Sequence, residues 1–134
     1  MKVIFDENKI KLIDLFQRMT GSNTVDCIDN DDTIYFLVKE GQYGLAVGKG
    51  GIKIKNVESR LKKTVKIFEY SEDIEKFIRN LIPDTKEISI TDESIIVKVK
   101  SNARAKVIGK SGKNMKIANE FLKRHFNRDD LKVK

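Results

Sequence analysis

The chain has 134 residues, enough for one ordinary domain or two small ones. Its 27 Lys and Arg outnumber its 20 Asp and Glu, and the resulting net charge of +7 favours a polyanionic partner. A hydrophobic content of 40% excludes a disordered protein, and no apolar stretch approaches the roughly 18 residues of a membrane-spanning helix. With one cysteine, Cys27, and one histidine, His125, an internal disulfide is excluded and a Cys- or His-rich metal site is disfavoured.

The N-terminal segment predicts a helix. An acidic residue, Asp6, occurs too early in the chain for the apolar segment of a secretory signal peptide. We therefore expect a cytoplasmic protein that enters no membrane. Asp6 can also cap a helix that ends near Gly21, because the apolar residues between them recur at helical spacing.

A hairpin and two helices are expected next. Strands at 25–28 and 33–38 flank a turn rich in Asp and Asn, and the alternation within the second strand predicts one buried face. The elements that follow are a short helix at 43–47, a longer helix with Ile54, Val57 and Leu61 on one face, and a strand at 65–70. The predicted order is αββααβ.

The second half of the chain predicts the same order. Ser71 is the expected cap of a helix that ends before Pro83, the only proline. The elements after it are a hairpin of strands 86–90 and 94–99, a short helix at 104–108, a long helix lined by Met115, Ala118 and Leu122, and a strand at 131–134.

An internal repeat relates the two halves. The segment Gly48-Lys49-Gly50-Gly51 recurs as Gly109-Lys110-Ser111-Gly112, and the same register aligns apolar positions on both sides of it. We interpret this as a tandem duplication with domains at 1–70 and 71–134. Because almost no linker separates two such small units, we expect them to be rigidly packed.

Each glycine loop is suited to hold phosphate. A G-x-x-G turn ahead of a helix exposes backbone N–H groups at the positive end of the helix dipole, and Lys49 or Lys110 adds a full charge. Residues 98–116 contain seven basic side chains and no acid, and residues 41–66 contain seven basic side chains and one acid. Lys53 and Lys113 therefore join the predicted binding residues.

These motifs resemble a known family. Both Gly-Lys-x-Gly loops and the apolar positions after them resemble KH modules, and the order αββααβ resembles the type II, prokaryotic form. The sequence segments around the loops resemble the archaeal NusA-like transcription factors, and so do Val65-Lys66-Ile67-Phe68-Glu69-Tyr70 and Leu122-Lys123-Arg124-His125-Phe126. The resemblance covers nearly the whole chain.

The resemblance implies an α+β fold of two tandem type II KH modules that bind single-stranded RNA in transcription termination or antitermination. The loop residues would contact the RNA backbone, and Ile54 and Met115 would form part of an apolar floor for the bases. We expect a monomer without metal, cofactor or enzymatic activity. Contact with RNA polymerase stays open, because the chain has no room for the further domains of bacterial NusA proteins.

Other interpretations are less favoured. The loops could be plain helix–helix turns, although two copies in register within basic stretches argue against this. Gly109-Lys110-Ser111 resembles the end of a nucleotide-binding P-loop, but the first glycine of that motif is replaced by Arg104. The acidic turn at 29–32 lacks the glycine and distal glutamate of a calcium loop.

Three function classes follow. The first is an RNA-binding transcription factor, the second is a protein of ribosome biogenesis or a ribosomal RNA-binding protein, and the third, disfavoured, is an NTPase. The identity of the bound RNA separates the first two.

Overall fold

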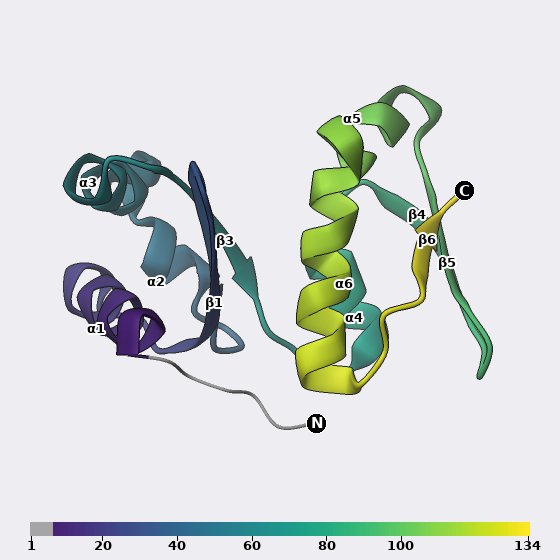
Figure 1. The fold of residues 1–134 in the computed structure, drawn as a ribbon, viewed down its shortest axis with the longest axis horizontal. Helices are drawn as coiled ribbons and strands as arrows, with labels where there is room; N and C mark the ends of the chain where they lie inside the picture. Colours follow the sequence, from purple (N-terminus) through teal and green to yellow (C-terminus); the bar gives the residue numbers. More distant parts are fainter. Residues whose placement is uncertain (1–6) are drawn as a thin grey trace. The chain divides into compact units, whose positions relative to one another are not determined.

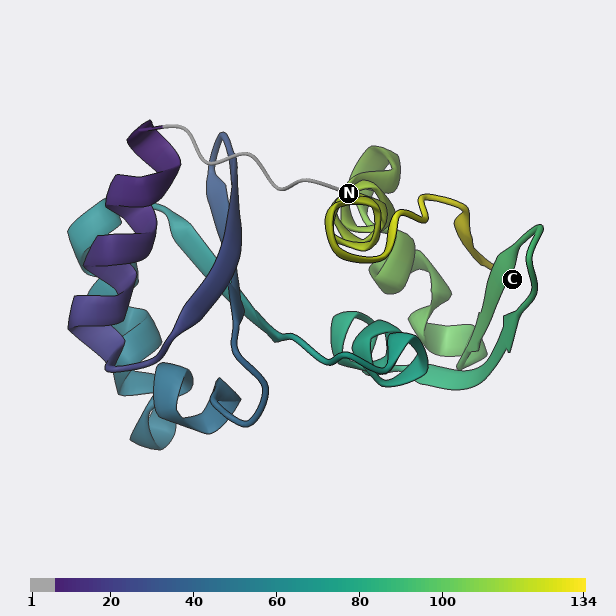
Figure 2. The same ribbon diagram turned by 90° about the horizontal axis from the view of Figure 1, so that it is seen from below.

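The computed structural model describes residues 7–134, which form two compact units divided between Glu72 and Asp73 (Figure 1). We call them the N-terminal unit and the C-terminal unit. Each has a three-stranded sheet with helices on one face, so the fold class is α+β as predicted (Figures 1 and 2). The predicted cap Asp6 lies outside the described residues. No helix within residues 7–134 is long and apolar enough to cross a membrane.

The N-terminal unit follows the predicted order αββααβ. Its elements are α1 (Glu7–Thr20), β1 (Thr24–Asn30), β2 (Thr33–Val38), α2 (Tyr43–Val47), α3 (Ile52–Leu61) and β3 (Thr64–Glu69). The strand order is β1-β2-β3, with β1 antiparallel and β3 parallel to β2. The hairpin prediction is confirmed.

The core of this unit lies between the sheet and its helices. Phe16 of α1 stacks on Phe36 of β2 with ring centroids 3.9 Å apart. The prediction of a buried face is confirmed, because Ile34, Phe36 and Val38 belong to the buried core, and the other residues of β2 are buried as well. On the other face, the ring of Tyr35 stacks with that of Phe68 at 6.2 Å, so apolar side chains occupy both sides of the strand.

The C-terminal unit repeats the order. Its elements are α4 (Ile74–Leu81), β4 (Thr85–Ile90), β5 (Ile95–Val99), α5 (Arg104–Ile108), α6 (Lys113–Phe126) and β6 (Leu131–Val133). The strand order β4-β5-β6 has the same antiparallel and parallel pairings as the first sheet. Here β5 does alternate, with Ile95, Val97 and Val99 buried.

One cap prediction is wrong. The N-cap of α4 is Asp73, whose carboxylate accepts a hydrogen bond from the Glu75 N–H at 3.1 Å. Ser71 instead lies in the segment between β3 and α4, where it is buried. A carboxylate two residues later serves as well as a hydroxyl at a helix start, so Asp73 takes the position.

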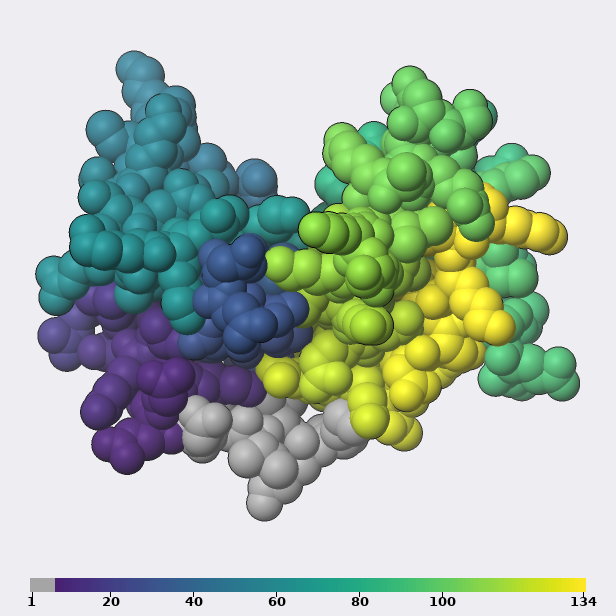
Figure 3. Space-filling model, turned by 45° about the horizontal axis from the view of Figure 1, so that its top comes forward, coloured from purple at the N-terminus to yellow at the C-terminus, as the bar shows by residue number. Residues whose placement is uncertain are grey.

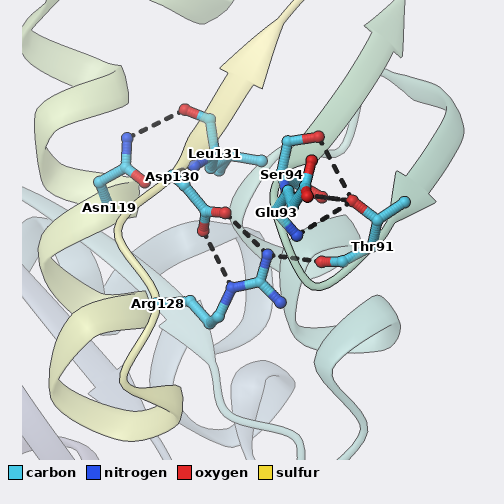
Figure 4. A network of polar contacts seen from close by, with 7 residues as sticks. All are labelled: Thr91, Glu93, Ser94, Asn119, Arg128, Asp130 and Leu131. Atoms are coloured by element: carbon cyan, nitrogen blue, oxygen red, sulfur yellow. Dashed lines mark hydrogen bonds and ion pairs between the residues drawn. The ribbon is translucent and has the colours of Figure 1, made fainter.

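The last strand of the C-terminal unit is held by a polar network (Figure 4). The Asn119 side chain accepts from the Leu131 N–H at 2.9 Å and donates to the Leu131 carbonyl at 3.1 Å. Arg128 donates to Asp130 and to the Thr91 carbonyl of the β4–β5 turn. The hydrogen bond from Arg128 lowers the pKa of Asp130 below its ordinary value.

Candidate nucleic-acid interface

The two glycine loops have the same backbone. Gly48 has φ 78° and ψ 166°, and Gly109 has φ 82° and ψ 168°. The third positions, Gly50 and Ser111, are both left-handed, with φ 63° and φ 56°. The predicted equivalence of the loops therefore holds at the level of individual dihedral angles.

Both loops connect a five-residue helix to a long helix. The first connects α2 to α3, and the second connects α5 to α6, as the sequence predicted. Each segment lies at the surface of its own unit in the space-filling view (Figure 3). A P-loop follows a strand, whereas the helix α5 directly precedes the second loop, so this segment lacks the P-loop context.

The first glycine of each loop is required for two reasons. Its φ and ψ fall in a region that is essentially restricted to glycine. A Cβ on Gly48 would also lie 2.7 Å from Cγ of Lys53, and a Cβ on Gly109 would lie 2.9 Å from the backbone N of Asn114. These contacts come from the residue five positions later, which folds back over the loop.

Lys53 and Asn114 make equivalent hydrogen bonds in the two units. The Lys53 ammonium donates to the carbonyls of Leu45 at 3.1 Å and Thr20 at 2.7 Å. The Asn114 amide donates to the Lys106 carbonyl at 2.9 Å, and Lys106 is the repeat equivalent of Leu45. Each side chain thus ties the long helix to the short helix and fixes the loop between them. Sequence reasoning missed Asn114, although the repeat register pairs it with Lys53.

The loops present unbonded donors. Within the described part of the chain, no intramolecular hydrogen bond is formed by the backbone N–H groups of Lys49 and Gly50, or by those of Lys110 and Ser111. The side chains of both loop lysines are exposed. Paired N–H donors beside a lysine at a helix start can bind a phosphate oxygen.

The other predicted site residues lie near the loops. Ile54 is half-buried and packs on the core of the N-terminal unit, and Met115 is half-buried in α6. Lys113 is the first residue of α6, directly after the second loop. Sequence reasoning missed three exposed apolar residues beside the first loop, Tyr43, Leu45 and Ile52.

Comparisons with known proteins agree with this geometry. A family model described as "KH domain" matches residues 13–82. A protein of Methanocaldococcus jannaschii named "Probable transcription termination protein NusA" is 36% identical, over 98% of this chain and 75% of its own length. A protein of Halococcus morrhuae with the same name is 30% identical over 99% of both chains. A crystal structure of a protein called APE1850 superposes with a TM-score of 0.79 and 30% identity, covering 97% of this chain and 100% of that one.

Proposed function

This chain belongs to the archaeal NusA-like family of KH-domain RNA-binding proteins, and we propose that it holds single-stranded RNA with both glycine loops to influence transcription termination or antitermination. The observation that carries the proposal is the pair of matched loops, each with two unbonded N–H groups and an exposed lysine. The family model ends at residue 82, so the role of the C-terminal unit rests on its repeated topology and its loop.

In the proposed mechanism the loop amides bind the RNA backbone. The residues that would contact phosphate are Gly48, Lys49, Gly50 and Gly51 in one unit, and Gly109, Lys110, Ser111, Gly112 and Lys113 in the other. Lys53 would act by holding the loop in shape, since its ammonium already donates to two carbonyls. Ile54 and Met115 would offer partly exposed apolar surface to the bases.

We further propose that the protein acts without enzymatic activity, as a cytoplasmic monomer, and that any effect on RNA polymerase follows from RNA binding. Two binding units on one chain would extend the footprint on one strand and raise affinity through effective concentration.

Two double variants test the loops. Lys49→Asp with Gly50→Asp, and Lys110→Asp with Ser111→Asp, place carboxylates where phosphates are expected. Both third positions are left-handed, a conformation that Asp tolerates, so the fold should survive. We expect each variant to lose most of its affinity for a single-stranded RNA in fluorescence anisotropy. Unchanged RNA affinity in both folded variants would exclude the glycine loops as the RNA-binding sites.

A matched control is Ser89→Asp with Lys132→Asp. It alters one serine and one lysine, both exposed, on β4 and β6 rather than in a loop. The control changes the net charge by as much as the second loop variant, so retained affinity there assigns the loss to the loop. Crosslinking and sequencing of bound RNA then separates a transcriptional role, with nascent transcripts, from a ribosomal one.

A further inference from the structure

Three exposed apolar side chains flank the first glycine loop in the sequence. Tyr43 and Leu45 of α2 are each 47% exposed, and Ile52, the first residue of α3, is 57% exposed. Only two other large apolar side chains of residues 7–134, Ile10 and Ile90, are comparably exposed. A concentration of exposed apolar residues around one loop indicates a contact surface.

The second loop carries charge at the same three positions. The repeat register pairs Tyr43 with Arg104, Leu45 with Lys106 and Ile52 with Lys113. The pairing is structural as well, because α2 and α5 are both five residues long and each is followed directly by its loop. Two loops with one backbone therefore differ at these three positions, which are apolar beside the first loop and basic beside the second.

Two hydrogen bonds fix the backbone of the short helix that carries two of the residues Tyr43, Leu45 and Ile52, which we call the apolar trio. The Tyr43 N–H donates to the Glu69 carboxylate at 3.0 Å, and the Leu45 carbonyl accepts from Lys53. The trio is thus presented on a fixed α2 and the start of α3, adjacent to the unbonded N–H groups of Lys49 and Gly50.

We propose that the two loops bind the RNA by different chemistry, and this rests on the function proposed above. The second loop holds phosphates through charge, with Arg104, Lys106 and Lys113 adding to Lys110. The first loop adds apolar contact with unpaired nucleotides to its phosphate-binding amides, with Tyr43, Leu45 and Ile52 packing against the bases. The occupant is RNA because the trio adjoins the phosphate-binding donors, and an aromatic ring with aliphatic neighbours suits the face of any base.

Two triple variants separate the contributions. Arg104→Gln, Lys106→Gln and Lys113→Gln should reduce the slope of log K against log salt by about 2, since each phosphate contact to single-stranded RNA contributes roughly 0.7. Tyr43→Gln, Leu45→Gln and Ile52→Gln should weaken binding about tenfold at every salt concentration and leave the slope unchanged. Ile10→Gln, on α1, is the matched control for an exposed apolar residue and should have no effect.

An abasic RNA identifies the contacted group. The apolar triple variant should bind abasic RNA as the unaltered protein does, because the bases that the trio contacts are missing. The proposal is overturned if both triples change the slope equally, if neither changes binding, or if the apolar triple weakens abasic RNA as much as ordinary RNA. No binding of RNA by the unaltered protein would instead overturn the proposed function itself.

Discussion

The N-terminal and C-terminal units support the same loop and the same third strand with different side chains. Lys53 and Asn114 occupy equivalent positions and hold the short helix. Later in the long helix, Glu58 accepts from the Val65 N–H at 2.8 Å, and its equivalent Asn119 binds Leu131. The position of each hydrogen bond is thus repeated in the two units even where the residue type differs.

The units differ in the path from the long helix to the last strand. α3 has 10 residues and α6 has 14, so the C-terminal unit gains about one helical turn. Phe126 in that turn packs on Phe77 of α4 with ring centroids 5.4 Å apart. The longer connection also carries Arg128 and Asp130, which pair with each other, whereas in the connection between α3 and β3 Lys63 pairs with Asp29 of β1 at 3.0 Å.

The largest expected effect is at the first glycine of each loop. Gly48→Ala and Gly109→Ala should each destabilise their unit by about 2–3 kcal/mol, because alanine does not adopt this conformation without strain and its Cβ would meet Lys53 or Asn114. Urea unfolding measures the loss. Gly44→Ala is the control, since Gly44 lies in α2 with open space around it, and we expect a slight gain in stability. Equal changes in stability for all three substitutions would contradict the conclusion that the first position of each loop requires glycine.

Substitution of Asn119 and of its equivalent Glu58, the side chains that bind the last strand of each unit, should reduce stability by different amounts. Asn119→Asp should destabilise the C-terminal unit by about 2 kcal/mol, because a carboxylate cannot donate to the Leu131 carbonyl. Glu58→Gln should cost less than about 1 kcal/mol, because an amide oxygen still accepts from Val65. Hydrogen exchange of the β3 and β6 amides reads each unit separately. A larger loss at Glu58 would show that charge, rather than hydrogen-bonding capacity, secures the strand.

A smaller, reciprocal effect is expected at the third loop position. Ser111 is left-handed with φ 56°, where glycine is unstrained, so Ser111→Gly should stabilise the C-terminal unit by about 0.5–1 kcal/mol. Gly50→Ser should destabilise the N-terminal unit by a similar amount. Chemical denaturation of both variants tests the pair. Effects of the same sign would mean that the two loops are not interchangeable.

Much of the fold could be predicted from the sequence because the pattern is local. The bounds of the short helices at 43–47 and 104–108 match, since each ends at a glycine. The cap of α4 was misplaced because Ser71 and Asp73 are both good caps, and only the path of the chain decides between them. Asn114 was missed because its role depends on the side chain folding back across the loop.

The smallest effect concerns the longer connection of the C-terminal unit. The pKa of Asp130 is lowered by the hydrogen bond from Arg128, so the ionised form is favoured in the folded protein. The stabilisation is present above the ordinary carboxyl pKa of 3.8 and is lost as the pH falls through the lowered value. Asp130→Asn should therefore be less stable than the unaltered protein near neutral pH, and the difference should shrink in acid. Hydrogen exchange should show this change in β6 and not in β3, because Arg128 and Asp130 lie next to β6, whereas the connection before β3 carries Lys63, whose pair with Asp29 is unaltered in this variant. If the substitution changed the pH dependence of hydrogen exchange equally in β6 and β3, the effect of Asp130 would not be specific to the C-terminal unit.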